Sequence, residues 1–223
     1  MLLAAGRGER MGELTLHRPK PLLEIAGKPL IEHHIIRLAA AGFRDIVINT
    51  AYLGEQIRDY LQNGCAWQVN IQYTEESQRL ETGGGILNAL PLLGDAPFLV
   101  VNSDVWTDFP YQTVPRQLSG KAHLVMVPNP SHNVGGDFSL EPCRSGEQQK
   151  VYQYTGRCHT FSGISVMTPS LFDGVSAGAF PLAPLLRAAM DNGEVSGELY
   201  SGYWVDVGTP QRLQQVVAHE EAM

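Results

Sequence analysis

Continuous apolar runs, separated by amphipathic segments, dominate the first half of the chain. Strands are expected at residues 1–5, 45–49, 69–73 and 98–102, and the last of these leads into Ser103 and Asp104. Helices are expected between Pro29 and Gly42, over 52–62, and from Thr82 to residue 90. Runs that are apolar throughout, without alternation, are typical of parallel strands whose two faces are both covered. The pattern therefore predicts an α/β fold with a parallel sheet between helices.

The pattern changes to shorter apolar runs after residue 120. Strands are expected at 123–127, 138–140 and 160–166, a loop over 129–150, a helix over 181–190, and a hairpin-like stretch through Trp204 and Val205. Thr209 and Pro210 predict the start of a last helix, because threonine is a good N-cap and proline is tolerated in the first turn. No repeat, low-complexity segment or linker divides the sequence, so one domain over 1–223 is expected.

Composition and charge restrict the class of protein. The chain has 223 residues, of which 43% are hydrophobic and 17% charged, which suits a folded domain with a sizeable core. A net charge of −7 argues against a nucleic-acid groove. No apolar run approaches the length of a membrane span, so no membrane partner and a cytoplasmic location are expected. Cys65, Cys143 and Cys158 are scattered, and indicate neither a disulfide framework nor a zinc site.

A glycine-rich loop follows the first expected strand. Gly6 and Gly8 permit tight turns in which successive N–H groups can face phosphate oxygens, and Arg10 and Lys20 add positive charge. The spacing to Gly12 is one residue too long for the dinucleotide fingerprint GxGxxG, and no GxxxxGK[ST] occurs. Because residues 1–28 hold five basic and three acidic side chains on an acidic protein, a small polyanionic ligand is expected.

Two aspartates stand at the ends of expected strands. Asp104 follows the run at 98–102, and Asp206 lies in the sequence WVDVGT before the last helix. Magnesium commonly takes one or two carboxylates together with substrate phosphates. A lone aspartate at a strand end is more often a turn residue, so a metal site requires that the fold bring the two together.

The runs LAAGRGERM and PKPL resemble the signature of the sugar-1-phosphate nucleotidyltransferases, and the resemblance continues over essentially the whole chain. It implies a Rossmann-like, mixed and mainly parallel sheet, the nucleotide-diphospho-sugar transferase fold. It also implies a nucleotide-binding half over 1–120, a sugar-binding half over 121–223, and transfer of a nucleotidyl group to a sugar 1-phosphate with release of pyrophosphate. A monomer or small homo-oligomer is expected.

The resemblance also implies roles for individual residues. Arg10 and Lys20 match the basic catalytic residues, and Asp104 and Asp206 match the aspartates that bind Mg²⁺ in the family. The residues implied in nucleotide binding are Ala4, Ala5, Gly6, Arg7, Gly8, Thr82 and Gly83. Those expected on the sugar side are Asn129, Asp137 and Gly163.

Three features depart from the family pattern. Gly12 and Glu13 replace a basic residue followed by proline, and Ser103 stands where glycine is usual. The Glu-Lys-Pro motif, whose lysine binds the sugar phosphate in many relatives, is absent. The residue that would bind the sugar phosphate is therefore left open, with Lys150 as a possible stand-in.

The identity of the base and sugar is left open by the motifs. The runs LETGGG, NSDVW, FSGISV and LAPLLRAAM are most similar to a compact subgroup of uridylyltransferases of peptidoglycan recycling, which favours UTP over another nucleoside triphosphate. The alternatives are a mannose-1-phosphate guanylyltransferase, a glucose-1-phosphate thymidylyl- or uridylyltransferase, and a non-catalytic nucleotide-sugar sensor. A glycosyltransferase is disfavoured because Asp104-Val105-Trp106 lacks the second acid of a DxD motif.

Overall fold

The computed structural model describes residues 1–141, 149–154 and 156–222, so Cys143 lies outside the described residues. The chain divides into two compact units. Unit 1 comprises Met1–Arg79, Asn102–Thr113 and Tyr203–Met223, and unit 2 comprises Leu80–Val101 and Val114–Gly202. Each unit therefore contains segments from both sides of residue 120. The predicted single domain with two halves meeting at that residue stays a prediction.

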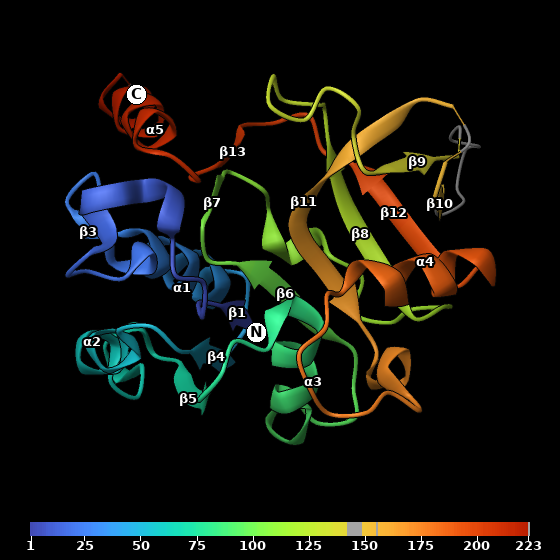
Figure 1. Cartoon of the computed structure of the whole chain (residues 1–223), viewed down its shortest axis with the longest axis horizontal. Coiled ribbons are helices and arrows are strands. Elements are labelled where there is room, and N and C mark those ends of the chain that lie inside the picture. The colour runs from blue at the N-terminus through green and yellow to red at the C-terminus, as the bar shows by residue number, and fades with distance from the viewer. Residues whose placement is uncertain (142–148, 155, 223) are drawn as a thin grey trace. The chain divides into compact units, whose positions relative to one another are not determined.

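Three parallel strands form the sheet of unit 1, in the order β5-β4-β1 (Figure 1). They are β1 (Leu2–Leu3), β4 (Asp45–Thr50) and β5 (Asn70–Glu75). The helices α1 (Leu30–Ala40) and α2 (Gly54–Leu61) connect them. All but the first residue of β4 are buried, as expected of a parallel strand covered on both faces. The predicted β-α-β-α-β order of this region is confirmed.

A second element of unit 1 joins segments that are distant in the sequence. The short strands β7 (Val105–Thr107) and β13 (Trp204–Asp206) pair in antiparallel fashion, and α5 (Pro210–Glu221) follows. Thr209 is the N-cap of α5 and accepts from the backbone N–H of Arg212, which confirms the predicted helix start. A core cluster secures this region; its buried members are Ile25, Leu30, Trp106, Val205, Val207 and Val216.

Smaller elements complete unit 1. The hairpin of β2 (Glu24–Ile25) and β3 (Lys28–Pro29) precedes α1. Short 3-10 helices span Glu9–Thr15, Lys20–Leu22, Cys65–Trp67 and Tyr111–Thr113.

Unit 2 is a mixed sheet with the strand order β6-β11-β8-β12-β10-β9. Its strands are β6 (Phe98–Asn102), β8 (Ala122–Val127), β9 (Phe138–Leu140), β10 (Gln149–Tyr152), β11 (Cys158–Met167) and β12 (Val195–Leu199). Its helices are α3 (Glu81–Leu93), the 3-10 helix Pro169–Phe172 and α4 (Ala183–Asp191). The strand β11 runs antiparallel to β6 and β8, whereas β12 runs parallel to β8.

Two sequence-based expectations are wrong. The hairpin through Trp204 and Val205 does not form, because β12 pairs with β8 and β10 while β13 pairs with β7. The stretch 129–150 is not a continuous loop, since it contains β9 and the start of β10; its residues 142–148 lie outside the described part. Among the described residues, no helix combines the length and apolar character needed to cross a bilayer.

The glycines at the start of α3 allow a close approach of two segments of unit 2. The N–H groups of Gly83 and Gly84 both donate to the carbonyl of Phe180, at 3.0 and 3.2 Å. A Cβ added to Gly84 would lie far inside van der Waals contact with the carbonyl oxygen of Gly178. The run of glycines therefore has a packing role.

We predict that Gly84→Ala destabilises the protein, although alanine ordinarily favours a helix interior by about 1 kcal/mol over glycine. The clash with backbone is expected to cost about 1–3 kcal/mol, measured as a lower free energy of unfolding in urea. Gly135→Ala is the control, because nothing lies within 4 Å of its added Cβ. A Gly84→Ala variant as stable as the wild type would contradict this packing role.

A buried histidine makes the stability depend on pH. Burial lowers the pKa of His34 from 6.5 to about 4, and the nearby Arg37 adds to this effect. Its Nδ1 lies 2.9 Å from the hydroxyl of Tyr111, and both side chains are buried. The fold therefore holds a neutral imidazole where the unfolded chain would take up a proton.

We predict that the stabilisation from neutral His34 is fully present above pH 6.5 and is lost as the pH falls towards 4. The unfolded state binds the extra proton in this window, so the loss should reach about 3 kcal/mol near pH 4. Urea unfolding of the wild type and of His34→Gln between pH 7 and 4 measures it, and the variant should show a shallower fall. Equal slopes would show that His34 does not cause the effect.

Candidate functional site

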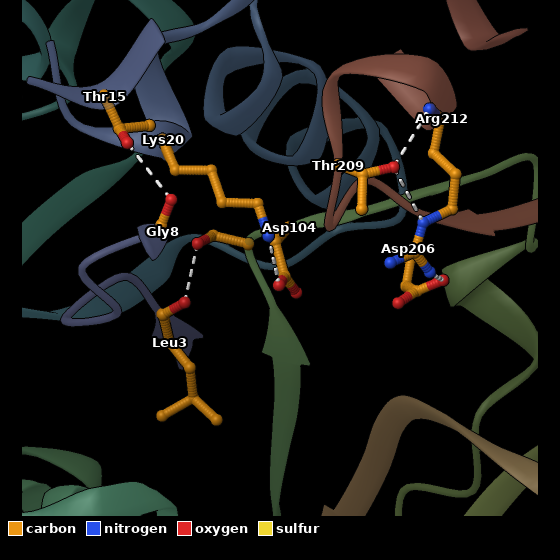
Figure 2. Close-up of polar contacts among 9 residues, drawn as sticks. Leu3, Gly8, Thr15, Lys20, Asp104, Asp206, Thr209 and Arg212 are labelled. Atoms are coloured by element: carbon orange, nitrogen blue, oxygen red, sulfur yellow. Dashed lines mark hydrogen bonds and ion pairs between the residues drawn. The ribbon is translucent and has the colours of Figure 1, made fainter. Parts of the chain in front are cut away.

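The glycine loop predicted to bind phosphate is fixed by its own hydrogen bonds. Gly8 has a left-handed backbone (φ 67°) and precedes the 3-10 helix Glu9–Thr15. Its carbonyl accepts from the N–H of Met11 at 2.8 Å and from the hydroxyl of Thr15 at 3.0 Å (Figure 2). A side chain at Gly8 would also crowd Lys20, whose Cβ would lie 3.1 Å away. Glycine is required at this position by both conformation and space.

The segment after the 3-10 helix Glu9–Thr15 is held by residues at the start of α2 and just before it. The hydroxyl of Tyr52 donates to the carbonyl of Leu16 at 2.8 Å, and the side-chain amide of Gln56 donates to the carbonyl of His17 at 3.0 Å. The guanidinium of Arg7 lies 5.2 Å from the centre of the Tyr52 ring, which is cation–π distance. Gln56 in α2 and Tyr52 in the turn before it therefore anchor the segment that follows the 3-10 helix Glu9–Thr15.

A buried polar network fixes the chain just before the loop. The N–H of Ala4 donates to Asn49 Oδ1 at 2.9 Å, and Asn49 Nδ2 donates to Glu76 Oε1 at 2.7 Å. Asn49 and Glu76 are both buried. The half-buried Ala5 and the exposed Gly6 follow this anchored position. The backbone N–H of Ala4 is thus already engaged by Asn49. The predicted contact of Ala4 with a nucleotide stays a prediction.

Lys20 and Asp104, 84 residues apart, form an ion pair. Lys20 Nζ lies 2.6 Å from Asp104 Oδ2, and the exposed fractions of the two side chains are 9% and 37% (Figure 2). Ser103 fixes the neighbouring backbone, since its hydroxyl and its N–H both donate to the carbonyl of Leu3, at 2.6 and 3.1 Å. The serine found where glycine is usual therefore ties the segment bearing Asp104 to β1.

Asp206 lies beside Asp104 because of strand pairing. In the ladder of β7 and β13, Asp206 is the partner of Val105, and the N–H of Val207 donates to the carbonyl of Asp104 at 2.8 Å. The structure thus brings the two aspartates together, as a shared metal site would require. Their role as metal ligands stays a prediction.

The donor set is suited to a hard cation. The two aspartates are partly exposed, and no group of three or more His, Cys, Asp or Glu side chains capable of holding a metal occurs among the described residues. Zinc sites in proteins normally use three or four such side chains, whereas Mg²⁺ uses one or two carboxylates and completes its shell with water and substrate phosphates.

Arg212 is a site residue that the sequence analysis missed. Its guanidinium forms an ion pair with Asp206 through Nη1, and its Nε lies 3.5 Å from the hydroxyl oxygen of Thr209 (Figure 2). Arg212 lies in the first turn of α5, where a positive charge opposes the helix dipole. That unfavourable placement was a signal in the sequence that this arginine serves something other than helix stability.

Arg10 is exposed and approaches the same region. A Cβ added to Gly208 would lie 3.1 Å from Arg10 Nη2 and 2.5 Å from Arg212 Nη2. Arg10 and Arg212, from opposite ends of the sequence, therefore meet at Gly208.

The residues predicted to contact the base lie in unit 2. Thr82 is exposed in the first turn of α3, and Gly83 is buried against Phe180, to whose carbonyl its N–H donates. A Cβ on Gly83 would overlap the Phe180 ring. Packing alone thus explains the glycine, and its contact with a base stays a prediction.

The residues predicted for the sugar side gather around one stretch of β11. Asn129 Nδ2 donates to the carbonyl of Cys158 at 3.1 Å, and Asp137 Oδ2 accepts from the N–H of Phe161 at 2.8 Å. Gly163, with φ 80°, lies where the register of β11 against β8 shifts between Phe161 and Ile164. The structure brings the three together within unit 2, and their contact with a sugar stays a prediction.

Comparison with known proteins adds independent information. The family described as "Nucleotidyl transferase" matches residues 1–134. The chain is 51% identical, over 98% of its length and 96% of the relative's, to N-acetylmuramate alpha-1-phosphate uridylyltransferase of Neisseria meningitidis serogroup B. It is 32% identical to the enzyme of the same name from Caulobacter vibrioides, over 95% of this chain and 92% of that one.

More distant relatives share the fold. A mannose-1-phosphate guanyltransferase of Hypocrea jecorina is 31% identical, over 95% of this chain and 61% of that one. The crystal structure of a putative glucose-1-phosphate thymidylyltransferase from Bacillus anthracis superposes with a TM-score of 0.85 at 17% identity, and covers 100% of this chain and 94% of that one. The predicted nucleotide-diphospho-sugar transferase fold is confirmed. Since the family matches more than half of its residues and a relative 51% identical aligns with nearly all of it, this chain belongs to the nucleotidyl transferase family, among the sugar-1-phosphate nucleotidyltransferases.

Proposed function

We propose that the protein transfers a uridylyl group from UTP to N-acetylmuramate α-1-phosphate, producing UDP-N-acetylmuramate and pyrophosphate in peptidoglycan recycling. The observation that carries this proposal is the 51% identity, over 98% of the chain, to a relative that bears the name of this activity. The relative named for mannose 1-phosphate and a guanylyl group is only 31% identical. Guanylyl transfer to mannose 1-phosphate is therefore the second candidate.

The charges of unit 1 suit this reaction. A sugar phosphate dianion must approach an α-phosphate that already carries negative charge, and repulsion opposes that approach. Arg10, Lys20 and the N–H groups of the loop at Gly6–Gly8 would offset the repulsion and align the attack. Because the attacking phosphate oxygen is already ionised, no side chain has to act as a strong general base or as a covalent nucleophile.

We propose Mg²⁺ as the cofactor, held by Asp104 and Asp206. Nucleotidyltransferases of this family generally use a divalent metal, and two carboxylates on backbone segments that lie side by side are a suitable donor set for magnesium. When bound, the ion would neutralise charge on the reacting phosphates. Lys20 and Arg212 hold the two carboxylates in place by ion pairs, so the ligands are oriented by the protein itself.

We propose that residues of unit 2 contact the base, the ribose and the sugar. Thr82 and Gly83 would contact the base and ribose, and Asn129, Asp137 and Gly163 would contact the sugar. Support comes from the gathering of the last three around one stretch of β11. A non-catalytic sensor is disfavoured because Lys20 and Asp104 are retained as a close ion pair in the phosphate-binding region.

The test is pyrophosphate release from a matrix of four nucleoside triphosphates and a panel of sugar 1-phosphates, with and without Mg²⁺. We expect release with UTP and N-acetylmuramate 1-phosphate that depends on the metal. Release confined to GTP with mannose 1-phosphate would select the second candidate. No release with any pair, together with nucleotide binding, would contradict catalysis and support a sensor.

We predict that Asp104→Asn and Asp206→Asn each lower kcat by on the order of 10³-fold, because each removes a charge that would hold the metal. Asparagine keeps the size but removes the ion pair with Lys20 or Arg212, so the thermal midpoint should fall while the fold is retained. Asp108→Asn is the matched control, since Asp108 is exposed and follows β7; its kcat should stay near that of the wild type. Wild-type rates in either Asp104→Asn or Asp206→Asn would contradict the metal assignment.

A further inference from the structure

One face of β11, in unit 2, carries a row of basic and aromatic side chains. Alternate residues from 158 to 162 are buried, whereas His159 and Phe161 between them are partly exposed. Successive side chains of a strand point to opposite faces, so His159 and Phe161 share the outward face, about 7 Å apart along the strand. Arg157 is exposed and comes directly before the strand. These three residues, Arg157, His159 and Phe161, are called the outer row of β11.

The backbone that bears the outer row is fixed by the loop that precedes β9. The side-chain amide of Asn129 donates to the carbonyl of Cys158 at 3.1 Å, and Asp137 Oδ2 accepts from the N–H of Phe161 at 2.8 Å. The N–H of Asp137 donates to the carbonyl of His159, also at 2.8 Å. Because the backbone is held on both sides of His159, the side chains of the outer row project in a defined direction.

The outer row carries a positive charge without an acidic partner in the described part of the chain. The ion pairs found among the described residues include neither Arg157 nor His159. Burial lowers the pKa of His159 from 6.5, and the nearby charge of Arg157 lowers it further. At neutral pH His159 is therefore uncharged and offers an N–H donor, while the positive charge belongs to Arg157.

This combination is suited to a sugar that has an anionic group of its own. Arginine can bind a carboxylate through two parallel N–H···O bonds, and an aromatic ring offers apolar contact area to a sugar ring. Mannose 1-phosphate and glucose 1-phosphate are neutral apart from the phosphate. N-acetylmuramate 1-phosphate differs from them in carrying a lactyl carboxylate as well.

We propose that the outer row of β11 binds the carboxylate of an acidic sugar, with Arg157 as its ion-pair partner, His159 as an N–H donor and Phe161 against the sugar ring. This inference rests on the proposed function, because it assigns the group that distinguishes N-acetylmuramate 1-phosphate from neutral sugar phosphates. The three residues are determinants of specificity and take no part in the transfer of the uridylyl group. The phosphate of the same substrate is the alternative anion, and the test separates the two.

The test measures steady-state kinetics of Arg157→Gln with UTP and Mg²⁺. We expect the KM for N-acetylmuramate 1-phosphate to rise about 10–100-fold, as for loss of a hydrogen bond between charged groups, with little change in kcat. Arg157→Lys should recover part of this loss, because it restores the charge without the two parallel bonds. The thermal midpoint should stay near that of the wild type, since Arg157 is exposed.

Two competitive inhibitors identify the anion. Free N-acetylmuramate has the carboxylate without the phosphate, and N-acetylglucosamine 1-phosphate has the phosphate without the lactyl group. We expect Arg157→Gln to weaken inhibition by the first and to leave inhibition by the second unchanged. The opposite result, or equal weakening of both, would assign Arg157 to the phosphate and overturn the inference.

Arg187→Gln is the matched control, because Arg187 is an exposed arginine of the same unit, on α4. It should change neither the KM nor the two inhibition constants.

The remaining outcomes separate this inference from the proposed function. An unchanged KM in an active Arg157→Gln enzyme would overturn the inference alone. A lowered thermal midpoint with a raised KM that lysine does not restore would show a structural role and would also overturn it. A wild type that does not turn over N-acetylmuramate 1-phosphate would instead be a failure of the proposed function.

Discussion

The antiparallel pairing of β7 with β13 is the constraint on which the candidate site depends. These strands have three residues each and lie about a hundred positions apart in the sequence, yet their register makes Asp206 the partner of Val105. Without that ladder Asp104 and Asp206 would each be a solitary carboxylate at a strand end. The buried cluster that includes Trp106, Val205 and Val207 holds the pair in place. Burial of apolar side chains thus determines the positions of charged ones.

Charge compensation is the second feature of the site. Each aspartate is paired with a basic side chain from another segment, Lys20 with Asp104 and Arg212 with Asp206. The pairs keep the carboxylates oriented at little electrostatic cost, because neither charge is left alone in a partly buried setting. The hydroxyls of Thr15 and Ser103 donate to backbone carbonyls, and the hydroxyl of Thr209 accepts from Arg212, which fixes the surrounding backbone and side chains. The region is therefore organised by the chain itself, which is what binding of two anionic substrates requires.

Local patterns in the sequence were sufficient for much of the fold. Long apolar runs predicted β4 and β6, and Thr209-Pro210 predicted the start of α5, because these signals depend only on neighbouring residues. The β7–β13 pair was missed, since three-residue strands have too few positions for a period and their pairing is non-local. The ion pair of Arg212 with Asp206 was also missed, although an arginine in the first turn of a helix was a visible anomaly. Motif resemblance named Asp104 and Asp206, but only the pairing explains why they lie together.

We propose that Asp104 and Asp206 form one divalent-metal site in unit 1. Its most direct test is anomalous diffraction from crystals grown with Mn²⁺ and UTP, recorded at the manganese absorption edge. We expect an anomalous peak in contact with the carboxylates of both aspartates and with the nucleotide phosphates. A bound nucleotide with its metal away from both carboxylates would contradict it.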